Sequence, residues 1–180
     1  MRSPAAKRVQ DIQRCSLKTM EQKTKQYVAV IRVRGDVGLS ADIRKTMQLL
    51  RLYRKNYCVV VPNTPSFSAM IFKIKDLATF GEISPETLLK LLKVRGRLAG
   101  NKLLTEDYLK TKLKIDVQTF CSEFSNFKKT FKDVPGLKSF FRLKPPTGGF
   151  ERKGIRHGYA EGGALGYRGK NINKLIERML

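Results

Sequence analysis

The segment from Ala164 to Asn171 (ALGYRGKN) comes closer to a catalytic motif than any other part of the sequence. Its glycines and lysine approach a phosphate-binding P-loop, in which backbone N–H groups cradle phosphates and a final Ser or Thr hydroxyl binds Mg²⁺. Here Asn171 holds that final position, and residues 161–163 (EGG) stand where a P-loop needs a hydrophobic strand. The segment therefore disfavours nucleotide hydrolysis. The glycines of this loop, flanked by Arg168 and Lys170 and followed by a helix, suit an RNA phosphate, although an ordinary solvated turn has the same pattern.

A second cation-rich segment, from Pro145 to His157, has little periodicity. So many glycines and cations cannot form a core element, and such segments commonly thread along a charged partner and order only in the complex. We expect four of its side chains to contact RNA: Arg152, Lys153, Arg156 and His157. Aromatic residues are interleaved here and just beyond, where they could stack on unpaired bases or pack back as anchors: Phe150, His157, Tyr159 and Tyr167.

A third set of cations lies nearer the N-terminus. Arg51 and Lys55 would each fall within about 20° of Arg44 at 100° per residue of helix, so the three would form one basic stripe. A charge run is usually a solvated face, but Asp42 is the only acid in this helix, so uncompensated repulsion favours a polyanionic partner. The same reasoning predicts RNA contacts for cations beside a strand end and around two glycines: Arg32, Arg34, Arg95, Arg97 and Lys102.

Other residue types give no sign of catalysis or of a cofactor. Cys15, Cys58 and Cys121 lack metal-ligand spacing, and an odd number of cysteines does not indicate a secreted disulfide framework. His157 is the single histidine and has no cysteine or carboxylate pair near it. We expect a chain of a reducing, cytosolic compartment that is not an enzyme and holds no metal or cofactor, without a membrane span or secretory signal.

The elements that must position these cations follow from hydrophobic patterning. We predict strands at 27–34, 56–62, 79–83 and 137–143. Helices are expected from Ser40, over 64–77, from Ser84 to Gly96, after Thr105, from Asp116 with a stripe at Phe120, Phe124, Phe127 and Phe131, and from Asn171. This order fits a small α+β layer, one sheet with helices on one face.

The chain has 180 residues and a formal net charge of +22, with 41% hydrophobic residues. It is long enough for one domain with a core, which excludes a disordered basic tail, and its charge makes nucleic acid the leading partner. The net charge is +5 over residues 1–27, +9 over 28–104, +2 over 105–138 and +6 over 139–180. We therefore expect the nearly neutral third segment to lie farthest from the RNA.

An ordered set of motifs resembles one known family over roughly residues 27–180. They are Val30 to Gly35 (VIRVRG), Leu49 to Leu52 (LLRL) with Asn56, Val94 to Arg97 (VRGR) with Ala99 to Asn101 (AGN), Phe141 to Leu143 (FRL) with Pro145-Pro146 and Gly149-Phe150, and Gly162 to Gly169 (GGALGYRG) with Ile172-Asn173 and Leu175-Ile176. The last is the most specific. Together they resemble the archaeal-type large-subunit ribosomal protein thirty family, whose eukaryotic cytosolic relative is numbered seven.

The resemblance implies a small antiparallel sheet related to ferredoxin-like topologies, with helices on one face and a helical insertion before the last strand. It also implies a cytoplasmic, non-catalytic component of the large ribosomal subunit, bound to large-subunit rRNA near 5S rRNA and to neighbouring ribosomal proteins. Carried onto this sequence, the family's RNA contacts fall on Arg32, Arg34, Arg51, Arg95, Arg97, Arg168 and Lys170. A ribosome-assembly paralogue that binds pre-rRNA transiently is the alternative.

We therefore divide the chain into four parts. Residues 1–26 form a basic arm, 27–104 the α+β core and 105–136 the helical insertion. Residues 137–180 form the returning strand, the basic glycine-rich loop and the C-terminal helix.

Overall fold

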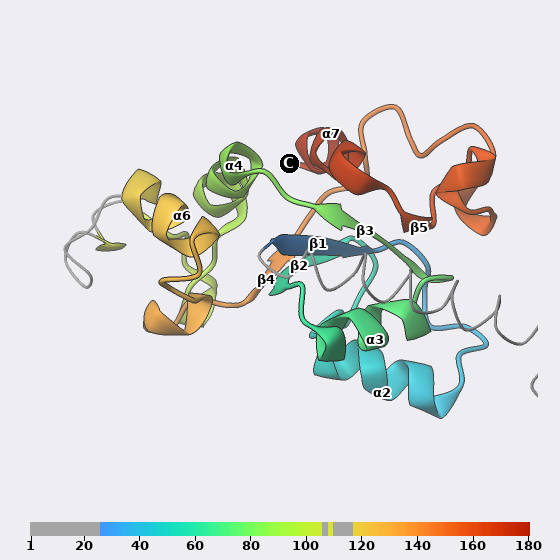
Figure 1. Ribbon diagram of the computed structural model, residues 1–180, viewed down its shortest axis with the longest axis horizontal. Coiled ribbons are helices and arrows are strands. Elements are labelled where there is room, and N and C mark those ends of the chain that lie inside the picture. Colours follow the sequence, from blue (N-terminus) through green and yellow to red (C-terminus); the bar gives the residue numbers. More distant parts are fainter. Residues whose placement is uncertain (1–25, 106–107, 110–116) are drawn as a thin grey trace, which may run out of the picture.

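The computed structural model describes residues 26–105, 108–109 and 117–180, which form a five-stranded sheet with helices. In chain order the strands are β1 (Tyr27–Arg32), β2 (Tyr57–Pro62), β3 (Ala78–Glu82), β4 (Phe140–Arg142) and β5 (Gly166–Tyr167). Across the sheet their order is β4-β2-β1-β3-β5 (Figure 1). The predicted α+β class is confirmed.

The sheet is mixed, whereas the sequence predicted an antiparallel one. All neighbouring strands pair antiparallel except β3 and β5, which pair parallel. Strand β5 lies beside β3 because the connection between β4 and β5 crosses from one edge of the sheet to the other before β5 begins. The four-part division of the chain stays a prediction, and residues 1–25 of the predicted arm lie outside the described residues.

The principal helices are α2 (Ala41–Leu49), α3 (Pro65–Lys73), α4 (Pro85–Arg95), α6 (Val117–Ser125) and α7 (Ile172–Met179). Ser40, Thr64 and Ser84 are the N-caps of the first three, and each side chain accepts a hydrogen bond from a first-turn backbone N–H. The starts predicted at Ser40 and Ser84 are thus confirmed, as is the end of α4 at Gly96. The expected helix after Thr105 and the start at Asp116 fall wholly or partly outside the described residues.

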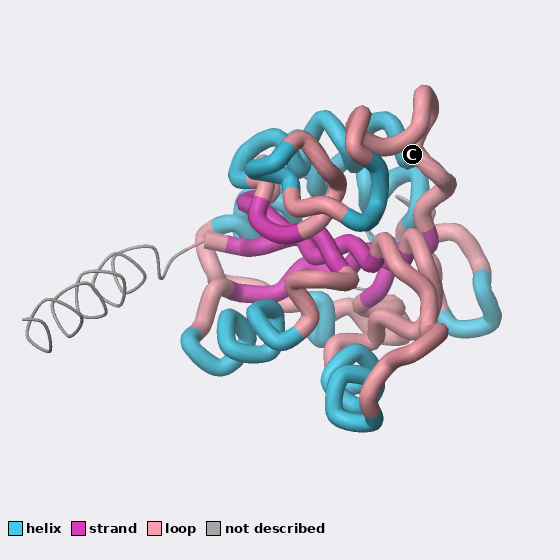
Figure 2. The backbone as a smooth tube through the Cα atoms, turned by 90° about the vertical axis from the view of Figure 1, so that its right-hand side faces the viewer, coloured by secondary structure: helices cyan, strands magenta, loops and turns pink. Residues whose placement is uncertain are grey.

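Both faces of the sheet are covered by helices, which corrects the prediction of one covered face. Every residue of β1 is buried. Alternate positions point to opposite faces of a strand: Tyr27, Ala29 and Ile31 join a core with α4, α6 and α7, whereas Val28 and Val30 join a core with α2 and α3. Figure 2 shows the strands enclosed between these two layers. A strand with two apolar faces requires two covering layers.

The phenylalanine stripe packs the insertion against the sheet, but it does not come from one long helix, and Phe127 is 37% exposed. Helix α6 ends at Ser125, Phe127 has φ 59°, and Phe131 begins a short 3-10 turn. The Phe124 ring stacks on Tyr27 of β1 at 4.0 Å between centroids, and the Phe131 ring meets Phe141 of β4 edge to face. The chain thus turns back on itself after α6 to bring these rings onto the sheet.

The insertion and the glycine-rich loop, which we define as residues 143–165 between β4 and β5, lie at opposite ends of β1 (Figure 1). At its first residue, Tyr27 stacks with Phe124 and Phe127 of the insertion. Just past its last residue, Val33 packs with Ala164 and Leu165 of the glycine-rich segment. Six strand residues at about 3.3 Å each separate the two ends by ~20 Å. This spacing sets apart the cations of the two segments.

Candidate nucleic-acid interface

Three exposed cations gather in a hollow at the C-terminal end of β1, which we call the basic hollow. Its volume is about 640 Å³, and its lining includes Arg34, Arg54, Lys55 and Ile155. The β1–α2 loop, the turn before β2 and the glycine-rich loop meet here, although they are far apart in the sequence. Asp36 also lines the hollow, but its carboxylate is paired with Arg32 at 2.5 Å. The three exposed cations therefore line one hollow, and the one acid in its lining is already paired with Arg32.

Arg32, predicted to contact RNA, lies inside the protein. Its side chain is 2% exposed, and it donates to the main-chain carbonyls of Arg34, Leu52 and Tyr53 as well as to Asp36. A guanidinium has five N–H donors, and these four partners occupy its nitrogens. We therefore correct the prediction: Arg32 holds two of the three segments that form the basic hollow, the β1–α2 loop and the turn before β2, and Arg34 is the exposed member of the pair.

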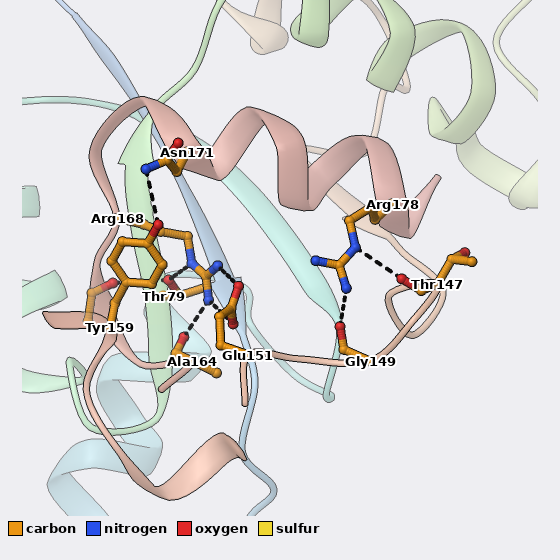
Figure 3. A network of polar contacts seen from close by, with 10 residues as sticks. Thr79, Thr147, Gly149, Glu151, Tyr159, Ala164, Arg168, Asn171 and Arg178 are labelled. Carbon is orange, nitrogen blue, oxygen red and sulfur yellow. Dashed lines mark hydrogen bonds and ion pairs between the residues drawn. The ribbon is translucent and has the colours of Figure 1, made fainter. Parts of the chain in front are cut away.

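Arg168 is also buried, at 5% exposed, and fastens the glycine-rich loop to the sheet (Figure 3). It forms a bidentate ion pair with Glu151, donates to Thr79 Oγ1 at 3.1 Å and to the Ala164 carbonyl at 3.1 Å, and lies 4.5 Å from the centre of the Tyr159 ring. This replaces its predicted RNA contact with a structural role. Sequence alone could not show that a lone glutamate would be its partner.

The ion pair sets the ionisation of Glu151. Burial raises the pKa of this carboxyl, but hydrogen bonds from Arg168 and its own backbone, together with the charges of Arg168 and Arg178, more than offset burial. The net result is a pKa below the ordinary glutamate value. Glu151 is therefore ionised near neutral pH and can hold the loop through charge-assisted hydrogen bonds.

The glycine-rich loop is folded onto the domain without a partner, contrary to the prediction that it orders only in a complex. Besides the Arg168–Glu151 pair, Arg178 of α7 donates to the carbonyls of Thr147 (3.0 Å) and Gly149 (Figure 3). Phe150 packs back onto the core. Four predicted contacts are exposed on this fastened loop: Arg152, Lys153, Arg156 and His157. Their assignment to RNA stays a prediction, but they project from a pre-formed loop.

The P-loop-like segment has a different geometry from a P-loop. Strand β5 has only two residues and lies inside the segment, where a P-loop has a longer strand before it, and the Arg168 N–H donates to the Phe80 carbonyl. Gly169 has φ +56° and lies very close to Gly81 of β3. A Cβ added at Gly81 would lie only 2.1 Å from the Gly169 carbonyl oxygen. These glycines thus serve the packing of α7 against β3. Lys170 is exposed at the start of that helix.

The predicted basic stripe does not form, because α2 ends at Leu49. Arg51 has φ 60°, and its side chain donates to Ser139 Oγ at 2.7 Å, so it departs from the helical path. Lys55 instead lines the basic hollow, and its side chain packs against Gly35: a Cβ added at Gly35 would lie 3.0 Å from the Lys55 Cε. Arg44 stays on α2, exposed. The hollow also contains Arg54, which we missed although it stands between Tyr53 and Lys55 in a local run of cations.

The remaining three predicted contacts lie at the insertion end. Arg95 is half-buried and donates to the Leu180 carbonyl, while Arg97 donates to the Asn101 carbonyl at 3.3 Å. Lys102 is exposed in the turn that Arg97 and Leu103 bridge. The structure therefore separates these residues from the basic hollow, and no single surface collects all fourteen predicted contacts.

The described residues contain no group of three or more His, Cys, Asp or Glu side chains that could hold a metal ion. Cys58 and Cys121 are buried, free thiols within this part of the chain. Burial raises the pKa of Cys58 to about 12 and, despite the opposing charge of Lys93, that of Cys121 to about 11. Both thiols are therefore protonated and unreactive in the folded protein.

Comparison with known proteins gives consistent matches. Residues 28–78 match the family described as Ribosomal protein L30p/L7e. The chain is 48% identical over 149 residues to Large ribosomal subunit protein uL30 of Methanopyrus kandleri, covering 82% of the chain and all of the relative. It is 47% identical over 152 residues to the proteins of that name from Methanococcus vannielii and Nanoarchaeum equitans, covering 84% of the chain and 98% and 97% of the relatives.

Proposed function

The chain belongs to the ribosomal protein L30p/L7e family, and we propose on this premise that it is a structural constituent of the large ribosomal subunit. In this role it binds large-subunit rRNA through Lys and Arg contacts to phosphates. Such contacts fix the position of RNA helices without reading their sequence. The proposed role requires no catalytic step, and its location is the cytoplasmic ribosome.

The observation that carries the proposal is the basic hollow. This concave surface is lined by Arg34, Arg54 and Lys55. Ile155 of the glycine-rich loop also lines it, so the exposed cations of that loop lie beside the hollow: Arg152, Lys153 and Arg156. Like charges this close repel one another in the free protein, and a phosphate backbone relieves that repulsion while releasing its counterions. A convex RNA backbone matches both the shape and the charge of this site.

The nearly neutral insertion supports an orientation. It lies about the length of β1 away from the basic hollow. We infer that the hollow and the glycine-rich loop face the RNA, with the insertion directed away from it or toward neighbouring proteins of the subunit. Contact with the 5S rRNA region, implied by the family resemblance, belongs to the same proposal.

A ribosome-assembly factor that binds pre-rRNA and then leaves is the alternative. Its surface would be equally basic, so sedimentation separates the two functions. One copy per mature, salt-washed large subunit supports a structural constituent, whereas presence only in precursor particles supports an assembly factor.

No described helix is long and apolar enough to cross a membrane.

The direct test is the salt dependence of binding to large-subunit rRNA. Affinity should fall steeply with salt, and Lys55→Gln should lower the slope of log affinity against log salt by about 0.7–0.9, the value of one phosphate contact. Lys128→Gln is the control, because it removes the same charge from an exposed residue of the insertion. A slope near zero for the natural protein, or equal effects of the two substitutions, would contradict the proposal.

A further inference from the structure

Three aromatic side chains lie together where β2 pairs with the edge strand β4. The Tyr57 and Phe140 rings stack at 5.3 Å between centroids with an interplanar angle of 7°. Tyr53, from the turn after α2, meets Phe140 edge to face at 6.0 Å and is 49% exposed. Tyr57 and Phe140 pack at the margin of the core formed with α2 and α3. The aromatic group thus continues the core to the edge strand β4.

Arg142 lies over this group. It faces Tyr57 directly across the β2–β4 ladder, and its guanidinium is 5.8 Å from the centre of the Tyr57 ring and 5.9 Å from that of Phe140. The side chain is exposed and forms no hydrogen bond or ion pair with any residue that the structure describes. Arg32 and Arg168, by contrast, are saturated with internal partners. The donors of Arg142 are therefore available to a ligand.

The group is held rigidly in the free protein. The buried Arg32 donates to the main-chain carbonyls of Leu52 and Tyr53, each at 2.9 Å. Arg51, with φ 60°, ties the same turn to the start of β4 through Ser139 at 2.7 Å. A surface positioned before binding loses little conformational entropy when it receives a ligand.

The surroundings favour a polyanion over an apolar protein surface. Residues 43–75 and 134–150, which supply the whole group, contain no aspartate or glutamate but many lysines and arginines. A hollow of about 280 Å³ beside Tyr53 is lined by Arg44 and Gln48, and its one acid, Asp36, is paired with Arg32. Rings, free cationic donors and an absence of unpaired acid are the features that bind unpaired nucleotides.

We propose that Tyr53, Tyr57, Phe140 and Arg142 form a stacking platform for an unpaired base of the bound RNA. The exposed Tyr53 ring receives the face of the base, and Arg142 binds the adjoining phosphate. A paired duplex hides its base faces, so the platform selects single-stranded nucleotides, in contrast to the phosphate contacts of the basic hollow. This inference rests on the proposed function and adds to it the kind of RNA structure that is bound.

The test compares two RNA probes with the full chain: a single strand containing the fluorescent base 2-aminopurine, and a paired duplex of the same length. The natural protein should quench the fluorescence of the single strand. Tyr53→Ala should remove the quenching and weaken single-strand binding about tenfold, leaving duplex binding unchanged. Tyr53→Phe, which keeps the ring, should behave as the natural protein.

The matched control is Phe72→Ala, since Phe72 on α3 is 47% exposed, close to the value for Tyr53. Equal losses for the two alanine variants, or single-strand binding and quenching that survive Tyr53→Ala, would overturn the platform. If single-strand binding and quenching survive Tyr53→Ala but duplex binding still falls steeply with salt, the platform is wrong and the proposed function stands. If the natural protein binds neither probe, both inferences fail. Unchanged RNA binding with weakened incorporation into subunits would assign the platform to a protein neighbour.

Discussion

Replacing Arg168 by alanine should open the glycine-rich loop. The substitution removes two hydrogen bonds to Glu151, one to Thr79 and one to the Ala164 carbonyl, and leaves the Glu151 carboxylate without its partner. Breaking a buried ion pair from one side costs about 3–5 kcal/mol. Because the Glu151 side chain is 22% exposed and can regain water, we expect the lower limit, about 3 kcal/mol. Arg168→Lys keeps the charge but loses the planar fork, so it should cost about half as much.

Two assays measure this effect. Urea unfolding gives the free energy of unfolding, and limited trypsin digestion reports the loop itself, since Arg152, Lys153 and Arg156 are cleavage sites on it. Trypsin should cut the loop of the Arg168→Ala protein much faster than that of the natural protein. Arg152→Gln, an exposed cation in the same loop, should leave the free energy of unfolding unchanged. A loss below about 1 kcal/mol with unaltered digestion would refute the fastening role of Arg168.

The ion pair also predicts a pH dependence. Because the folded-state pKa of Glu151 is lowered, its stabilising contribution is complete above the ordinary glutamate value of about 4.3 and is lost as pH falls through the folded-state value. The difference in free energy of unfolding between the natural protein and Glu151→Gln should therefore be constant near neutral pH and shrink below about pH 4. A difference that grows with acidity would contradict this sign.

Two further predictions concern the core. Gly81→Ala should lower the free energy of unfolding by about 1–3 kcal/mol, because the added Cβ would lie 2.1 Å from the Gly169 carbonyl oxygen, whereas Gly158→Ala meets no atom within 4 Å and should cost much less. Thermal or urea denaturation compares the two, and equal costs would contradict the close approach. Cys58 and Cys121 should stay unlabelled by a thiol reagent at pH 8 until the protein unfolds, because burial raises the pKa of both thiols. Mass spectrometry locates the label, and native labelling at either position would show that the core is open.

Local patterns in the sequence were sufficient for most elements of the fold. The serines at 40 and 84 begin helices because their side chains accept the first-turn N–H groups, a signal contained in a few adjacent residues. The β-branched run at 56–62 likewise predicted a strand, and β2 is found at Tyr57–Pro62. Val28 and Val30 already indicated that helices cover the second face of the sheet, because they make that face of β1 apolar. The prediction of helices on one face only overlooked these two residues.

The candidate site was less predictable, because a sequence records that an arginine is present but not what surrounds it. Arg32 and Arg34 stand two residues apart in one basic motif, yet one is buried among carbonyls and the other opens onto the basic hollow. Arg168 differs from Lys170 in the same way. Long-range partners made these differences: Leu52 and Tyr53 for Arg32, Glu151 and Thr79 for Arg168.

The sequence by itself determined the net charge, the helix starts, the apolar faces and the family, since each depends on residue identity or on spacing within a few turns of chain. Tertiary structure alone decided which cations are free to bind an anion. A guanidinium that reaches carbonyls and a carboxylate inside the fold uses its N–H donors in internal hydrogen bonds that stabilise the protein. A guanidinium at the surface can donate to a ligand instead. Folding thus buries some arginines, such as Arg32 and Arg168, where they hold loops in place, and leaves other cations exposed in the basic hollow.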